Sequence, residues 1–390
     1  MHKYCESPKF APHGKGREGI LIVLESPSNA DDENGSYYSG KSGAVVRDTM
    51  LRLGYDIDKD CKSIYAVGCK LAGNIIKDES ARALCEPGVW NVIAEMKPRT
   101  IIAMGQLALK TVMRHTSNVG DVVKWAGSVI SDRDLKAAVC PTQSPVEVIM
   151  DRTGITRKYF IEDLERVSRI HKRKKKMVFH TPNHEEQYVT RLVDSKKVMR
   201  FLKDVARNYR HKDIAIDYET SGLKPHRKEH AILCASIAFG PKSAVSFILR
   251  EEHMPIFKRI LYDKTIGKIA HNMKFEMSWS REKVGTMGRG WLFDTMVAQH
   301  VVDNRTGVAG LKYQTYIRYG VRNYDSHISS FLKSEEESAN GFNNVKDAPP
   351  DQVLMYCGLD TIYTYMLAFD LVKELKHKTI KFRSSVWQPR

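Results

Sequence analysis

Acidic side chains in the second half of the sequence occur at spacings that could bind cations. Asp217 and Glu219 occupy alternate positions of "DIAIDYE", whose alternation predicts a strand with both side chains on one face. Two carboxylates on one face are costly unless a cation lies between them. In a purely structural strand, two uncompensated carboxylates at the buried end would destabilise the fold. The pair therefore predicts a cation site.

Two further segments supply matching chemistry. "KIAHNMKFEMSW" predicts a strand followed by a helix, with Asn272 near the helix start and Glu276 one turn further on. "PPDQVLMYCGLDTIYTYMLAFDLVKEL" predicts a long helix. Tyr356 and Asp360 stand four positions apart and therefore share a face of that helix. A third acid, a fourth acid and a tyrosine thus accompany the first pair.

The first half contains a different pattern, "GSYYSGKSG" at residues 35–43, which has the G-x-x-x-x-G-K-S spacing of a phosphate-binding loop. Such a loop should directly follow its strand. Here "SPSNADDEN" intervenes, and its acids would repel a triphosphate. The nucleotide-hydrolase interpretation is therefore the weaker one, while contact between Lys41 and a DNA phosphate remains an expectation.

Composition narrows the class of partner and the compartment. The 390 residues include 62 Lys and Arg against 46 Asp and Glu, a net charge of +16, which favours a polyanion such as nucleic acid over an indifferent basic surface. Seven widely spread cysteines without a signal-like start predict a reducing, intracellular and cytoplasmic location. The apolar run "GILIVL" is too short to span a membrane, so we expect no membrane contact.

The chain is predicted to hold two domains, residues 1–170 and 171–390, both of α/β type. Strand and helix patterns alternate in the first half, and the like-charge block "RIHKRKKK" at 169–176 predicts a solvated linker or helix end. After it the pattern restarts with a helix, three successive strands from "DIAIDYE" to "SAVSFIL", and then mainly helices. We find no internal repeat.

Three segments of the second half carry a family resemblance. "DYETSGL", "HNMKFE" followed by "FDTM", and "YCGLD" resemble the motifs of DEDD-type 3'-5' exonucleases of the tyrosine subclass, and are similar to the proofreading domain of family A DNA polymerases over roughly residues 177–375. The resemblance implies a ribonuclease H-like mixed sheet and two divalent metal ions, Mg or Mn, with Asp217 bridging both. It implies the metal ligands Asp217, Glu219, Glu276 and Asp360.

The same resemblance assigns further roles. Tyr356 would orient or help to deprotonate the attacking water, Leu223 would wedge against the terminal base, and Asn272 and Thr220 would contact the frayed strand. In this family the third acid is usually aspartate, so Glu276 places its carboxylate about one methylene further out. The alternative is a domain that keeps the exonuclease fold but whose catalytic site is degraded. Three neighbouring residues are predicted to pack or cap rather than catalyse: His271, Asp294 and Trp279.

The first half carries a second resemblance. "VLESPSN", "GSYYSGKSGAVVRDTMLRLG" and "KPRTIIAMGQLA" resemble the uracil-DNA glycosylase superfamily, especially its iron-sulfur branches. Gly35, Gly40 and Gly43 fall on the family glycines, and Tyr38 falls where a ring would stack on a flipped base. Ser144 stands where the family has histidine and Tyr65 where it has asparagine. We therefore expect a domain that binds DNA or a protein rather than one that excises uracil.

The cysteines of the first half extend this second resemblance. Cys69 and Cys85 have the spacing of the cluster-binding glycosylases, and Cys5 matches one of the N-terminal pair, with His2 at the position of the other. The resemblance implies a [4Fe-4S] cluster with three cysteines and a different fourth ligand. Ordinary buried thiols are the alternative.

Together these patterns predict a glycosylase-like α/β domain fused to a metal-dependent 3'-5' exonuclease that acts on DNA, on single-stranded 3' ends and primer-templates. Its role would be proofreading for a family A DNA polymerase. About thirty residues follow Asp360, so the polymerase subunit is expected on a separate chain or a missing segment. The alternatives are a non-catalytic DNA-binding or polymerase-accessory module and a uracil repair enzyme.

Overall fold

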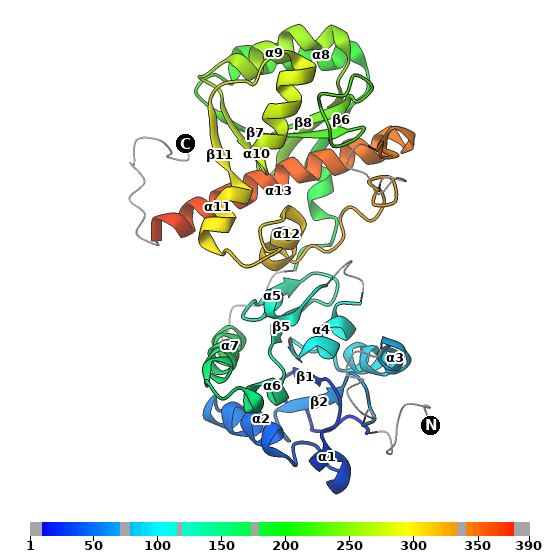
Figure 1. The fold of residues 1–390 in the computed structure, drawn as a ribbon, viewed down its shortest axis with the longest axis vertical. Coiled ribbons are helices and arrows are strands. Elements are labelled where there is room, and N and C mark those ends of the chain that lie inside the picture. Colours follow the sequence, from blue (N-terminus) through cyan, green and yellow to red (C-terminus); the bar gives the residue numbers. More distant parts are fainter. Residues whose placement is uncertain (1–9, 71–78, 115–118, 173–178, 334–340, 378–390) are drawn as a thin grey trace. The chain divides into compact units, whose positions relative to one another are not determined.

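The computed structural model describes residues 10–70, 79–114, 119–172, 179–333 and 341–377. They form two compact α/β units, each with its own sheet (Figure 1). Unit 1 comprises Met1–Pro182 together with Tyr316–Arg322, and unit 2 comprises Asn183–Thr315 together with Asn323–Arg390. The predicted boundary at residues 170 and 171 falls at the end of a helix of unit 1 and stays a prediction.

Unit 1 is built on a five-stranded sheet in the order β2-β1-β3-β5-β4. The first four of these strands are parallel, and β4 runs antiparallel to β5. The buried runs "ILIVL" and "TIIAM" form β1 and β3 as their uninterrupted hydrophobicity predicts. The strands are β1 (Ile20–Leu24), β2 (Cys61–Tyr65), β3 (Thr100–Met104), β4 (Ile130–Asp132) and β5 (Ala137–Thr142).

Helices cover both faces of this sheet. One core cluster joins residues of β1, β3 and β5 to side chains of α2, α6 and α7. On the other side α3 packs against α4, which contacts β3 and β1. The helices are α1 (Asn29–Asn34), α2 (Lys41–Arg52), α3 (Glu79–Met96), α4 (Gln106–Val112), α5 (Val122–Trp125), α6 (Pro145–Met150) and α7 (Ile155–Lys172).

The segment Tyr316–Arg322 returns to unit 1 and binds β4. Arg322 and Asp132, which are 2% and 0% exposed, form a buried ion pair. The Tyr316 hydroxyl donates to Asp132 Oδ2 at 2.6 Å, and the Tyr316 ring meets the edge of Trp125. Arg133 Nε donates to the Tyr319 carbonyl at 2.8 Å. Unit 1 therefore contains a piece of chain that lies far from the rest of it in sequence.

Unit 2 is built on a six-stranded mixed sheet in the order β11-β10-β7-β8-β9-β6. The central pairs β7 with β8 and β8 with β9 are antiparallel, whereas β10 runs parallel to β7. This mixed sheet confirms the predicted ribonuclease H-like fold. Its strands are β6 (Val189–Leu192), β7 (Asp213–Thr220), β8 (Ile232–Gly240), β9 (Ser243–Ile248), β10 (Gly267–Ala270) and β11 (Trp291–Asp294).

Helices of unit 2 lie on both faces of its sheet (Figure 1). One core cluster joins α8 and α9 to β7, β8 and β9, while α13 crosses the sheet and contacts β8, β7 and β9. The amphipathic pattern of "SKKVMRFLKDVARN" explains why α8 buries Val198, Leu202 and Val205. The helices are α8 (Ser195–Asn208), α9 (Met254–Tyr262), α10 (Met273–Trp279), α11 (Thr295–Val302) and α13 (Pro350–His377). A further helix, α12 (Leu311–Tyr319), begins in unit 2, and its residues from Tyr316 on belong to unit 1.

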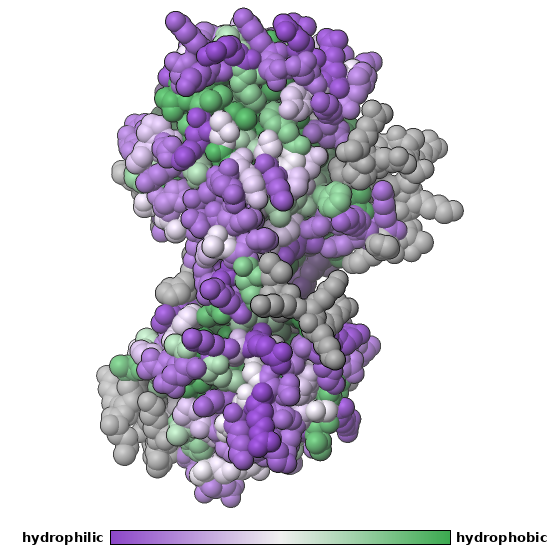
Figure 2. All heavy atoms as spheres, turned by 180° about the vertical axis from the view of Figure 1, so that it is seen from behind, coloured by the Kyte–Doolittle hydropathy of each residue, from purple (hydrophilic) through white to green (hydrophobic). Residues whose placement is uncertain are grey.

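The surface is mainly hydrophilic on the face of each unit that Figure 2 shows. Hydrophilic residues are expected there because the chain carries 108 charged Lys, Arg, Asp and Glu residues, 62 plus 46. None of the helices in the described parts of the chain is long and apolar enough to cross a membrane.

Candidate functional site

Three elements of unit 2 carry the acidic residues predicted from sequence. Asp217 and Glu219 lie two apart near the end of β7, Glu276 lies in the first turn of α10, and Tyr356 and Asp360 lie one turn apart on α13. Because α13 packs across β7, its polar face meets the carboxylates of that strand.

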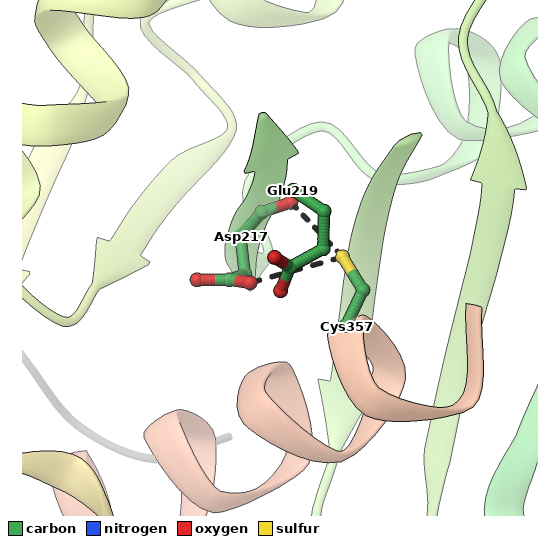
Figure 3. A group of neighbouring side chains, drawn as sticks. All are labelled: Asp217, Glu219 and Cys357. Atoms are coloured by element: carbon green, nitrogen blue, oxygen red, sulfur yellow. Dashed lines mark hydrogen bonds between the residues drawn. The ribbon is translucent and has the colours of Figure 1, made fainter. Parts of the chain in front are cut away.

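Asp217 and Glu219 approach each other and a thiol of α13 (Figure 3). One ligand atom of each of Asp217, Glu219 and Cys357 lies within 4.8 Å of the others. Cys357 Sγ donates to the Asp217 carbonyl oxygen at 3.6 Å and to Asp217 Oδ2 at 3.7 Å. The thiol therefore helps to fix the orientation of the first acid.

Burial and mutual repulsion disfavour the charged forms of these acids. Burial raises the pKa of Asp217 well above its usual range, and the charge of Asp360 raises it further. The pKa of Glu219 is raised well above its usual range by burial and then by Asp217. The pKa of Glu276 is raised well above its usual range by the same two causes. The acids thus form one electrostatically coupled cluster.

Asp360 differs from the other three acids because donors surround it. Burial raises its pKa to about 6, but hydrogen bonds from Tyr324 and Tyr356 and the charge of Lys312 oppose that rise. The Tyr324 hydroxyl donates to Asp360 Oδ1. Asp360 is therefore held in one orientation by the protein itself.

The donor set fits divalent cations of the magnesium and manganese type. Among the described residues, Glu276 Oε2 is buried without a hydrogen-bond partner, which is costly unless a cation or solvent meets it. Carboxylate oxygens are the ligands that Mg²⁺ and Mn²⁺ prefer. The thiol of Cys357 is a poorer ligand for these ions, because burial raises its pKa well above the usual value and keeps it protonated.

The start of α10 is shaped by an unusual backbone conformation. Asn272, the N-cap residue, has a φ of 64°, a region that asparagine tolerates better than most residues. Asp294 accepts from the Asn272 and Met273 amides at 3.2 and 2.9 Å, and it also caps α11 through the Met296 amide at 2.9 Å. Asp294 therefore has the predicted capping role and fixes the helix that carries Glu276.

Unit 1 contains a separate half-buried acid at the carboxyl end of its parallel strands. Glu25 follows β1, and its Oε1 accepts from the Leu107 amide at 3.1 Å. Burial raises the pKa of Glu25, while hydrogen bonds from Ser144 and the amides of α4 oppose that rise. Strand order reverses at β1, and such a point is where ligands bind in open α/β sheets.

Comparison with protein families divides the chain in the same way. Residues 11–168 match the uracil DNA glycosylase superfamily, and residues 186–376 match the 3'-5' exonuclease domain of family A DNA polymerases. The chain belongs to the uracil DNA glycosylase superfamily through its first half, and its second half is similar to the exonuclease domain. Both predicted resemblances are thereby confirmed.

Two curated relatives cover different parts of the chain. A type-4 uracil-DNA glycosylase of Pyrobaculum aerophilum is 30% identical over 170 residues, which are 42% of this chain and 83% of that protein. A DNA polymerase of Bacillus phage SP01 is 22% identical over 397 aligned positions, which cover 94% of this chain and 41% of the polymerase. The phage protein is thus similar to nearly the whole of this chain.

Among solved structures, Brucella melitensis NrnC bound to pGG is similar to part of this chain. It is 22% identical, with a TM-score of 0.37, over 49% of this chain and 83% of NrnC.

The predicted nucleic-acid contacts of the exonuclease domain lie close to the acids in sequence and differ in exposure. Leu223 is 62% exposed just beyond β7, as a wedge requires. Thr220 is buried, and its Oγ1 donates to the Gly222 carbonyl at 2.7 Å, while its own carbonyl accepts from Asn343 Nδ2 at 2.9 Å. The binding roles of Leu223, Asn272 and Thr220 stay predictions.

In the glycosylase superfamily domain Tyr38 is buried rather than presented as an open platform. Its exposure is 7%, its hydroxyl shares a hydrogen bond of 2.6 Å with Ser63, and the Arg47 guanidinium lies over its ring. Lys41, the first residue of α2, is exposed. The roles of both in DNA binding stay predictions.

The iron-sulfur prediction gains no support from the described residues. Cys69 is buried and Cys85 partly exposed, whereas Cys5 and His2 lie outside the described residues. Within the described ranges, the group of three or more metal-ligating side chains is that of Asp217, Glu219 and Cys357. Cys69 and Cys85 are free thiols there.

Sequence reasoning missed three residues of the acid cluster: Cys357, Tyr324 and Lys312. Cys357 directly follows Tyr356, so its position in the motif was the available signal. Tyr324 is 36 positions from Asp360, and Lys312, whose charge lowers the pKa of Asp360, is further away still in the sequence. No local periodicity links residues that far apart.

Proposed function

We propose that this chain is a metal-dependent 3'-5' exonuclease that removes nucleotides from DNA ends. The observation that carries the proposal is the acid cluster, in which ligand atoms of Asp217 and Glu219 lie within 4.8 Å of each other. Asp217 interacts electrostatically with Asp360 and Glu276 as well, and burial raises the pKa values of all four. Such a cluster is unfavourable by itself and suits a site that gathers positive charge. The match of residues 186–376 to a 3'-5' exonuclease domain supports the polarity of the reaction.

In this proposal Asp217, Glu219, Glu276 and Asp360 would hold two divalent cations. When bound, these cations would activate water and stabilise the leaving oxygen of an in-line displacement. Tyr356 lies beside the cluster, and burial together with the neighbouring Asp360 charge raises its pKa well above the usual value. Its hydroxyl therefore stays protonated and orients the attacking water as a hydrogen-bond partner.

The nucleic-acid strand would enter over exposed apolar and basic side chains. Leu223, which is exposed, would separate the terminal base from its neighbour. The net charge of +16 favours binding of the phosphate backbone through counterion release.

The biological role that we infer is proofreading for a family A DNA polymerase. Support comes from the phage DNA polymerase, whose similarity extends over 94% of this chain. This chain covers 41% of that DNA polymerase. DNA is therefore the proposed substrate.

For the glycosylase superfamily domain we infer DNA binding without uracil excision. Tyr65, at the position where the family has asparagine, is 3% exposed and stacks on Tyr37 with ring centroids 4.4 Å apart. Ser144, at the position of the family histidine, is buried and hydrogen-bonds Glu25. An incubation with uracil-containing DNA should leave no alkali-labile sites, and cleavage at uracil after alkali would contradict this inference.

The main proposal is tested with a 5'-labelled single strand and a mismatched primer-template, incubated with Mg²⁺ or Mn²⁺. We expect a ladder that shortens from the 3' end and is absent with EDTA and with Asp217→Ala. An RNA strand of the same sequence is degraded more slowly if DNA is the substrate. DNA that is bound but stays intact with either metal would contradict the proposal and favour the accessory-module alternative.

A further inference from the structure

Asp360 is the acid of the cluster for which the protein supplies the most hydrogen-bond donors. Tyr324 donates to its Oδ1, and Tyr356 bonds it from one turn earlier on α13. By contrast, Asp217 receives a weak thiol donor at 3.7 Å, and Glu276 Oε2 is buried and unpartnered within the described residues. Two tyrosine hydroxyls therefore bond the same carboxylate. Of these two tyrosines, the resemblance to the exonuclease family assigned a role in the site to Tyr356 alone.

Tyr324 is held in place by packing on both sides of Asp360. Its ring centroid lies 4.9 Å from that of Tyr363 and 6.0 Å from that of Tyr356, both on α13. The next residue, Asp325, pairs with Lys312 of α12, and its carbonyl accepts the Ile328 and Ser329 amides at 2.9 and 2.8 Å. The turn that presents Tyr324 is therefore fixed from two directions.

We propose that Tyr324 is a positioning residue of the nuclease site, which holds the Asp360 carboxylate in its metal-binding orientation and leaves the Tyr356 hydroxyl available for the attacking water. This inference rests on the proposed function. Tyr324 bonds Oδ1 of Asp360 and so leaves Oδ2 for a cation, once Tyr356 exchanges its own bond to Asp360 for one to the water. Hydrogen-bond partners of ligating carboxylates commonly have this role, and removing one typically lowers metal affinity or activity about 10- to 100-fold.

The division of labour between the two tyrosines is testable with hydroxyl-deleted variants. Tyr324→Phe should weaken binding of Mn²⁺, measured by calorimetry without nucleic acid, by about tenfold. Tyr356→Phe also removes a hydrogen bond to Asp360, the weaker of the two, so it should weaken Mn²⁺ binding clearly less than Tyr324→Phe does, and it should lower kcat with little change in KM. In Tyr324→Phe the loss of cleavage should be partly restored by raising the Mn²⁺ concentration, whereas in Tyr356→Phe it should not.

Tyr363→Phe is the matched control. Its ring contacts Tyr324, it is 1% exposed, and its hydroxyl donates to Glu185 Oε2 at 3.2 Å rather than to an acid of the cluster. Wild-type Mn²⁺ affinity is expected for this variant. Equal weakening in Tyr324→Phe and Tyr363→Phe would overturn the proposal, because it would indicate a general packing effect.

The outcomes also separate this inference from the proposed function. If Tyr324→Phe binds Mn²⁺ and cleaves DNA as the wild type does, the positioning role is wrong while the exonuclease stands. If the wild type binds Mn²⁺ without degrading DNA and Tyr324→Phe weakens that binding, the positioning role stands while the proposed function is wrong.

Discussion

The acidic residues of the exonuclease domain oppose the stability of the fold that holds them. Glu219, Glu276 and Asp360 are buried. Burial disfavours the charged form of each carboxylate, and the charge of Asp217 adds to this for Glu219 and Glu276. Water solvates these groups better in the unfolded chain, so their charged forms favour unfolding. A site selected only for stability would not gather four of them.

The first prediction concerns pH and follows from Asp360. Its pKa is raised from 3.8 to about 6, so protonation stabilises the fold fully below about pH 3.8. That stabilisation, about 3 kcal/mol, is lost as the pH rises through about 6. The free energy of unfolding of metal-free protein, measured with urea in EDTA, should therefore fall between pH 4 and pH 7.

Two controls accompany this measurement. Asp360→Asn cannot titrate, so its stability should fall less steeply over the same interval. Mn²⁺ at pH 7 should recover much of the lost stability, because a ligand that binds the folded state stabilises it. A pH-independent free energy of unfolding, or one that rises towards pH 7, would contradict the coupled acid cluster.

The second prediction concerns the unusual third acid. Glu276→Gln removes the charge but keeps the shape, so it should lower DNA cleavage at least 100-fold while it stabilises metal-free protein by about 1 kcal/mol or more. Glu276→Asp keeps the charge and shortens the side chain by one methylene. It should lower the free energy of unfolding by about 1 kcal/mol and should retain DNA cleavage within about tenfold of the wild type. Cleavage rates and urea unfolding check both variants. Wild-type cleavage by Glu276→Gln would show that Glu276 has no part in the site.

At the scale of elements, the placement of α13 decides whether Tyr356 and Asp360 reach the strand acids. Gly358 lies on this helix between them, and a Cβ there would come within 2.3 Å of Val189 Cγ1 and 2.6 Å of Ser246 Oγ. The missing side chain therefore permits α13 to approach β6 and β9 closely.

The third prediction follows from this close approach. Gly358→Ala should destabilise the protein by about 1–3 kcal/mol through overpacking and should lower nuclease activity because α13 must shift. Gly240→Ala is the matched control, since nothing lies within 4 Å of a Cβ at that position. Urea unfolding should separate the two variants. Equal stability in both would mean that α13 does not pack as described.

At the scale of the whole chain, unit 1 depends on a segment from the second half. Asp132 is buried on β4 and takes its cation from Arg322, across 190 positions of sequence. Losing one member of a buried ion pair leaves the other charge uncompensated in the interior.

The fourth prediction tests this dependence. Arg322→Met should destabilise unit 1 by about 3–5 kcal/mol, and Asp132→Asn in the same chain should restore a large part of that loss because no bare charge remains. Thermal unfolding of the single and double variants, followed with a probe in unit 1, provides the comparison. An Arg322→Met variant as stable as the wild type would show that Asp132 does not need this partner.

Local signals in the sequence predicted much of this architecture. The alternation in "DIAIDYE" predicted β7, which extends over Asp213–Thr220, and the long apolar pattern after residue 349 predicted α13 at Pro350–His377. These elements carry four of the five predicted catalytic residues. The predictions of these two elements were accurate for a physical reason. Burial of one face imposes a period of two residues on a strand and of 3.6 residues on a helix.

The remaining features depend on contacts between distant segments. The pairing of Tyr324 with Asp360 and of Arg322 with Asp132 leaves no periodic trace in the sequence, because each pair joins residues 36 or 190 positions apart. The return of Tyr316–Arg322 to unit 1 was not foreseen for the same reason. Such contacts are fixed by tertiary packing, which overrides local propensity.

The central claim, a metal-dependent 3'-5' exonuclease, is tested most directly by combining end-blocked DNA with matched carboxylate variants. Asp217→Asn removes an acid of the cluster, whereas Asp213→Asn changes an acid at the other end of the same strand. We predict that wild type and Asp213→Asn degrade a single strand with a blocked 5' end in Mn²⁺ and spare one with a blocked 3' end. Asp217→Asn should degrade neither. Degradation of the 3'-blocked strand, or undiminished cleavage by Asp217→Asn, would contradict the account.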